Sequence, residues 1–159
     1  MGKTFILFLA LWAPIPALAQ GPALGSERQF WVWQNSQPPQ QRQLTATLRK
    51  VGLRSYIYVE NAFWREGMDA QLEWIHDRLE NATPSGSLDQ KKGILPLLLE
   101  IFGQLPKNVT DDPTLIVLLA DLGRGGAGYF SPFDQLKNSE SQLKGHQSNE
   151  GNLVYLNAR

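Results

Sequence analysis

Two histidines are the residues of this sequence best suited to acid–base or metal chemistry. His76 has Glu73 and Glu80 three and four residues away, at helical spacing. A metal site there would need further ligands from elsewhere in the chain, so we favour a solvated helix histidine beside acids. His146 lies in a polar stretch with Glu150; a surface histidine is favoured, with a single metal ligand as the alternative.

Motifs of established catalytic or metal sites are missing from the 159 residues. There is no His-Glu-x-x-His, no Gly-x-Ser-x-Gly and no calcium loop of alternating carboxylates. The absence of Cys excludes disulfides, thiol catalysis and cysteine-ligated zinc. The 15 Lys and Arg balance the 15 Asp and Glu, so the net charge of zero gives no electrostatic footprint for nucleic acid. We therefore assign no catalytic residue and no metal ligand.

A glycine-rich run, Gly123 to Gly128, satisfies the dinucleotide-binding pattern G-x-G-x-x-G and follows a predicted strand. A dinucleotide site also needs a helix that opens at the third glycine and offers its N–H groups to the pyrophosphate. Pro132 follows four residues later and opposes a helix interior there. We therefore predict a glycine turn that leads into an extended segment.

The N-terminus has the layout of a secretory signal peptide, residues 1–19. Lys3 precedes the apolar run 5–13, prolines break that run, and Ala17-Leu18-Ala19 forms an A-x-A cleavage site. A membrane anchor is the alternative, but the apolar run is short for a bilayer about 30 Å thick. We expect a secreted chain, extracellular or periplasmic, with no stable membrane anchor after cleavage. A flexible segment, 20–29, would then precede one domain, 30–159.

Period-two alternation, β-branched runs and continuous apolar runs predict the strands of that domain. For 44–51 a helix is the rival interpretation, and the Gln- and Pro-rich stretch 34–42 is a predicted linker. The aromatic residues Trp31, Trp33, Tyr56 and Tyr58 alternate along two of the strands; sheet packing is favoured over sugar stacking. The predicted strands are 30–33, 44–51, 54–60, 114–120 and 152–157.

Two helices are predicted between the third and fourth of these strands. Met68, Leu72, Ile75 and Leu79 recur at helical spacing, and 94–102 is a strongly apolar helix with Pro96 in its first turn. Residues 137–150 are polar and are predicted to form a loop. The alternation of strands and helices indicates an α/β (α+β) fold, and a sheet covered on both faces by helices is the economical arrangement.

Several stretches together resemble secreted bacterial zinc metallopeptidases of the immune inhibitor A and hyicolysin kind, members of the zincin superfamily. The residues that carry this resemblance are 126–135, 148–150 and 153–158, with weaker support from 45–49, 56–60 and 102–103. The resemblance implies a zincin-like twisted mixed sheet with two packing helices, incomplete at the C-terminus. It also implies that Gly126, Ala127, Gly128, Tyr129 and Phe130 form an edge strand that pairs with an extended peptide or protein substrate.

Relatives of this kind hydrolyse peptide bonds with a zinc-activated water, held by a His-Glu-x-x-His helix. That helix is absent from this sequence, so we expect the N-terminal part of a metallopeptidase, truncated before the zinc helix and inactive as given. Zinc would belong to the full-length relative, and no cofactor is expected in this chain. The alternative hypothesis is a non-catalytic secreted binding module that uses the aromatic strands or the glycine-rich edge.

Overall fold

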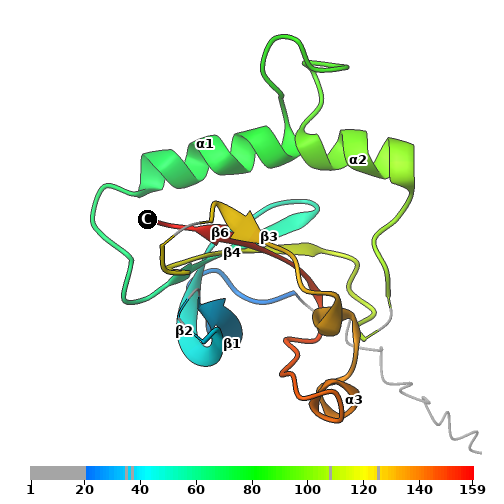
Figure 1. Cartoon of the computed structure of the whole chain (residues 1–159). Helices are drawn as coiled ribbons and strands as arrows, with labels where there is room; N and C mark the ends of the chain where they lie inside the picture. The colour runs from blue at the N-terminus through cyan, green and yellow to red at the C-terminus, as the bar shows by residue number, and fades with distance from the viewer. Residues whose placement is uncertain (1–20, 35, 37, 108, 125) are drawn as a thin grey trace, which may run out of the picture.

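The computed structural model describes residues 21–159 apart from 35, 37, 108 and 125 (Figure 1). The predicted signal segment, 1–19, lies outside these residues. Within the described part, the strands are β1 (Glu27–Gln34), β2 (Gln40–Val51), β3 (Ser55–Glu60), β4 (Leu115–Ala120), β5 (Gly128–Tyr129) and β6 (Asn152–Asn157). The helices there are α1 (Asp69–Glu80), α2 (Ile94–Phe102) and α3 (Asn138–Gln142), with a 3-10 turn, η1 (Pro132–Gln135).

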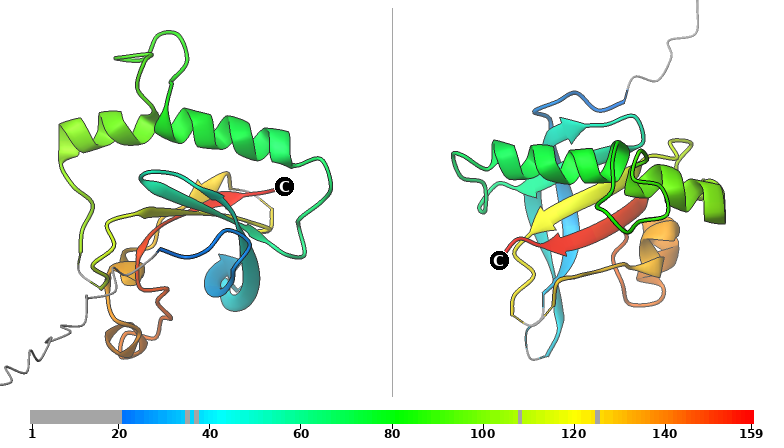
Figure 2. Two further views of the ribbon diagram at one scale, coloured as in Figure 1. Left: turned by 180° about the vertical axis from the view of Figure 1, so that it is seen from behind. Right: turned by 90° about the horizontal axis from the view of Figure 1, so that it is seen from above.

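The strands form a single mixed sheet in the order β1-β2-β3-β4-β6-β5. The first three strands make an antiparallel meander, whereas β3, β4 and β6 run parallel to one another. β5 closes the order by pairing antiparallel with β6. Figure 2 shows β4 and β6 side by side beneath the helices. The mixed α/β class predicted from the sequence is therefore confirmed.

The predicted strands are present, but two of them are longer than the local patterns indicated. β1 begins at Glu27, so 27–29 belong to the sheet and not to a flexible N-terminal segment. β2 begins at Gln40, inside the stretch predicted as a linker, and the helical alternative for 44–51 is wrong. Both extensions have one cause. β1 and β2 pair residue for residue from Glu27↔Thr47 to Gln34↔Gln40, and this pairing supplies polar residues with backbone partners.

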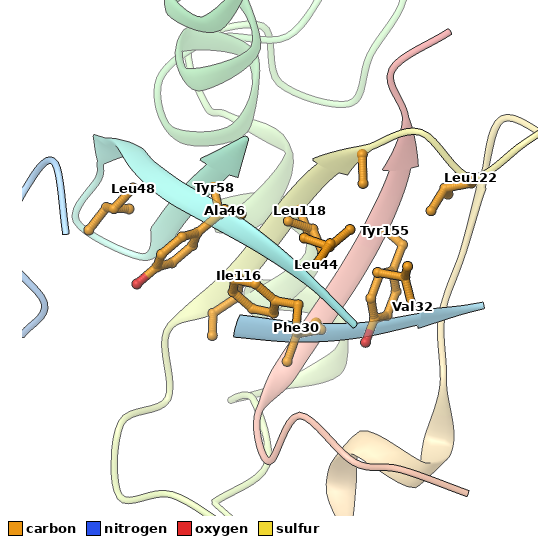
Figure 3. Close-up of a cluster of buried hydrophobic side chains, with 12 residues drawn as sticks. Phe30, Val32, Leu44, Ala46, Leu48, Tyr58, Ile116, Leu118, Leu122 and Tyr155 are labelled. Carbon is orange, nitrogen blue, oxygen red and sulfur yellow. The ribbon is translucent and has the colours of Figure 1, made fainter. Parts of the chain in front are cut away.

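The helices do not cover both faces of the sheet, so that prediction was wrong. α1 and α2 lie over the same face, where Leu72 packs with Ile57, Val59, Val117 and Leu119 (Figure 1). On the opposite face the sheet folds over itself, and the β1–β2 hairpin supplies the cover (Figure 3). That second core comprises Phe30, Val32, Leu44, Ala46, Leu48, Tyr58, Ile116, Leu118, Ala120, Leu122, Leu153 and Tyr155.

Local sequence explains where the helices lie. Leu72 is buried on α1, and Met68, Ile75 and Leu79 pack beside it, as their spacing predicts. α2 spans the predicted residues and ends at Gly103, whose φ of 85° favours glycine. The polar stretch 137–150 is not entirely a loop, because it contains the short helix α3. No helix in the described part of the chain is both long and apolar enough to cross a membrane.

Candidate functional site

The open edge of the sheet is the strand β5, which follows the glycine-rich turn. Gly128 pairs with Leu156 and Tyr129 with Tyr155, and the Asn157 N–H donates to the Ala127 carbonyl at 2.8 Å. In an antiparallel ladder, successive residues direct their backbone groups alternately toward and away from the partner strand. Since Ala127 and Tyr129 bond toward β6, the N–H and C=O groups of Gly128 point to the open side.

The five residues predicted for the edge lie along this side of the sheet, although the strand itself is shorter than predicted. Gly126 and Ala127 belong to the turn, Gly128 and Tyr129 form β5, and the Phe130 side chain is 60% exposed. As predicted, the glycine run leads into an extended segment, and the helical turn begins only at Pro132. A pyrophosphate-binding helix N-terminus is therefore not formed at Gly128.

Asn157, at the end of β6, holds the turn that presents the edge. Its amide nitrogen donates to the carbonyls of Gly123 at 2.9 Å and Gly126 at 2.8 Å, and its amide oxygen accepts from the Leu122 N–H at 3.2 Å. One side chain thus satisfies three backbone groups of a segment that has no regular partner. The position of β5 is consequently fixed by β6, not by the glycine sequence alone.

Gly128 occupies a position that has no room for a side chain. A Cβ atom at this position would lie 2.2 Å from the Tyr155 carbonyl oxygen, in the neighbouring strand. At Gly126 a Cβ would meet no atom within 4 Å. The close approach of β5 to β6 within the chain therefore requires glycine at position 128.

Gly128→Ala should destabilise the fold, because a backbone oxygen must move to admit the new methyl group. We expect a loss of about 1–3 kcal/mol in the free energy of unfolding, measured by urea denaturation. The matched variant, Gly126→Ala, should fall within about 0.5 kcal/mol of the unmodified chain. Equal costs for the two alanines would contradict the packing assigned to Gly128.

An apolar pocket of about 250 Å³ opens beside β5 and is called the Trp33 pocket below. Its walls come from the end of β1, the turn before β2, the segment after β4, and β5. The Tyr129 hydroxyl accepts a hydrogen bond from the backbone N–H of Trp33 at 2.8 Å, and burial raises the pKa of that hydroxyl. The lining residues are Trp33, Gln34, Pro39, Leu122, Gly126, Gly128 and Tyr129.

A buried polar network lies next to the pocket and is joined to it through Tyr129. The Tyr129 ring stacks on Tyr155, with centroids 4.2 Å apart. The Tyr155 hydroxyl donates to Asp134 Oδ2 at 2.6 Å and accepts from the Asn149 amide at 2.6 Å. The Asn149 N–H donates to Asp134 Oδ1 at 2.7 Å, and its side chain pairs with both backbone groups of Trp31. This network ties the segment after β5 to β1 and β6.

Asp134 is a carboxylate in an apolar setting, with 1% of its surface exposed. Burial raises its pKa, because desolvation disfavours the charged form, and the hydrogen bonds from Tyr155 and Asn149 oppose that shift. No buried network was predicted for Asp134, Asn149 and Tyr155, although all three lie in the stretches that resemble the metallopeptidases. Around Asp134 and Asn149 the local signal is polar residues, which are equally typical of a surface loop.

Neither histidine lies in a metal-binding arrangement. The two acids near His76 have other partners: Glu73 pairs with Lys50, and Glu80 accepts a hydrogen bond from the Ser55 hydroxyl at 2.6 Å. His76 is half-buried and not a freely solvated residue. In the described residues, no group of three His, Cys, Asp or Glu side chains is placed to hold a metal ion. The donor set in this part of the chain therefore does not match a zinc site, and no chemistry is assigned to zinc here.

His146 is also half-buried, and so less exposed than a freely solvated surface histidine. Its ring stacks on Phe133 at 3.7 Å between centroids, and the Trp33 ring lies edge-on at 5.7 Å. The imidazole therefore helps to hold Trp33 at the wall of the pocket. Tyr58 is 2% exposed and packs against Phe30, which agrees with sheet packing rather than an open aromatic platform.

Comparison with known proteins adds no family to this description. No protein-family model matches the chain, and a search of curated proteins also found no match. The candidate site therefore rests on geometry: an open strand edge with a pocket of apolar and aromatic side chains directly beside it.

Proposed function

We propose that this chain binds extended peptides along the open edge of β5, as the substrate-binding sheet of a secreted zincin-like endopeptidase. The observation that carries the proposal is the outward direction of the Gly128 backbone groups at a sheet edge. An extended peptide added there would gain main-chain hydrogen bonds and bury the edge. The Trp33 pocket beside the same edge offers room for a side chain.

Hydrolysis forms no part of what we assign to this chain. Its two histidines are 70 residues apart in sequence, and neither belongs to a His-Glu-x-x-His motif. The resemblance to metallopeptidases supports the proposed origin, and the mixed sheet with α1 and α2 packed on it is compatible with the sheet that this resemblance implies. The alternative hypothesis was a binding module without catalysis. If that module binds through its glycine-rich edge, it uses the same surface. Both interpretations therefore share one test, which is peptide binding.

Fluorescence anisotropy with fluorescein-labelled peptides of alternating Val and Thr, each with one central Phe, tests this binding. We expect saturable binding that is lost when alternate peptide nitrogens are methylated in one register and kept when they are methylated in the other. The reason is that only every second N–H of a paired strand faces β5. Equal loss in both registers, or no binding at all, would overturn the proposal.

Two variants at Phe130 test the main-chain hydrogen bonds between β5 and the peptide by changing the protein instead of the peptide. Phe130→Pro removes an N–H predicted to face the open side, and proline is tolerated at such edge positions. Phe130→Ala keeps the N–H and removes the side chain. We expect the proline variant to bind about 2- to 10-fold more weakly than the alanine variant, which corresponds to one hydrogen bond. Equal affinities would place the peptide elsewhere.

A further inference from the structure

We propose that the Trp33 pocket selects a bulky apolar side chain, aromatic or leucine-sized, from the peptide bound along β5. This inference rests on the proposed function and names the class of peptide that the site takes. It makes the sheet edge selective, whereas hydrogen bonding to a backbone would accept nearly any sequence.

The pocket and the edge are continuous. Gly128 and Tyr129 line the pocket and are also the two residues of β5. Two lining residues place the pocket on the face of the sheet opposite α1 and α2. Leu122 belongs to the second core on that face, and the Tyr129 ring packs against it. Side chains of a strand alternate between faces, so every second side chain of a paired peptide would point to the pocket side.

The size and chemistry of the pocket fit an apolar group. Its volume of about 250 Å³ exceeds the roughly 150 Å³ of an apolar cavity that takes up benzene. Among the described residues that line it there is no Asp, Glu, Lys or Arg. The backbone N–H of Trp33 donates to the Tyr129 hydroxyl and is therefore already occupied. A charged side chain would lose hydration there without an oppositely charged group beside it, so acidic and basic residues are disfavoured.

A peptide series that differs at one position measures this selectivity. The probes are the Val–Thr peptides described above, with Phe, Leu, Ala or Asp at the central position. Burial of a large apolar side chain should make the Phe peptide bind about 10- to 100-fold more tightly than the Ala peptide, with Leu close to Phe and Asp weakest. If Phe, Ala and Asp peptides bind equally, the selectivity is overturned while peptide binding itself stands.

Gly126→Phe tests whether the pocket itself makes the selection. A Cβ at Gly126 meets open space, and the residue lines the pocket, so the added ring would occupy the volume without a backbone clash. We expect the Phe-to-Ala affinity ratio to fall to near one. Gly126→Ala adds a single methyl group and should lower the ratio only slightly.

Leu98→Ser provides the matched control on the other face of the sheet. Leu98 is 43% exposed on α2 and lines a separate apolar groove with Phe130 and Val154. The variant should leave the Phe-to-Ala ratio unchanged. A ratio lost in Leu98→Ser and kept in Gly126→Phe would overturn the assignment, because the side chain would then enter the groove. Failure of every peptide to bind would instead refute the proposed function.

Discussion

Replacing Glu80 with Ala should cost about 2–4 kcal/mol of the free energy of unfolding, a large part of the roughly 5–15 kcal/mol that stabilises an ordinary domain. Glu80 lies at the end of α1, and 4% of its side-chain surface is exposed. One carboxylate oxygen accepts from Ser55 Oγ at 2.6 Å and from the Arg54 N–H at 3.0 Å. Without Glu80, the buried Ser55 hydroxyl loses its acceptor, and α1 loses its tie to the β2–β3 turn.

Urea unfolding of three variants checks this expectation. Glu80→Gln keeps an oxygen acceptor and should cost less than Glu80→Ala. Glu73→Ala, on the same helix, removes an exposed carboxylate that pairs with Lys50 and should cost at most about 1 kcal/mol. Similar losses for Glu73→Ala and Glu80→Ala would show that Glu80 contributes no more than a surface ion pair.

Tyr155→Phe should be the second most damaging substitution, with a loss of about 2–3 kcal/mol at neutral pH. It removes one hydroxyl and leaves both Asp134 Oδ2 and the Asn149 amide without that partner. Both of these side chains are buried, so water does not replace the lost bonds. Tyr129→Phe is the matched control, because it removes a hydroxyl that accepts one backbone hydrogen bond, and it should cost about 1 kcal/mol.

The cost of Tyr155→Phe should also grow with pH. The folded-state pKa of Asp134 is raised above its ordinary value of 3.8, so its protonated form is favoured by folding, and that stability is lost as pH rises through the folded pKa. The Tyr155 bond opposes the shift, so removing it raises the pKa further. Chemical unfolding measured from pH 3.8 upward should show the gap between variant and parent widening. A constant gap would mean that Tyr155 does not bond the ionised carboxylate.

The sequence by itself determined the elements whose signals are local. Helix 94–102 was predicted with the bounds that α2 has, since an apolar run with Pro96 near its start and Gly103 at its end is a complete local signal. The continuous apolar run at 114–120 indicated a strand buried on both faces, as β4 is. Residues 126–130, predicted as an edge strand, lie at the edge of the sheet, where Gly128 and Tyr129 form β5.

Only the tertiary structure decided how these elements meet. The wall of the Trp33 pocket joins residues 96 positions apart, and Asp134 meets Tyr155 across 21 positions. No local periodicity encodes such pairs, because they depend on strand order and on the β1–β2 hairpin folding over one face. That hairpin provides the cover that was expected from a helix. It also explains why Asp134 and His146, residues of types normally found at the surface, lie partly or fully inside the fold.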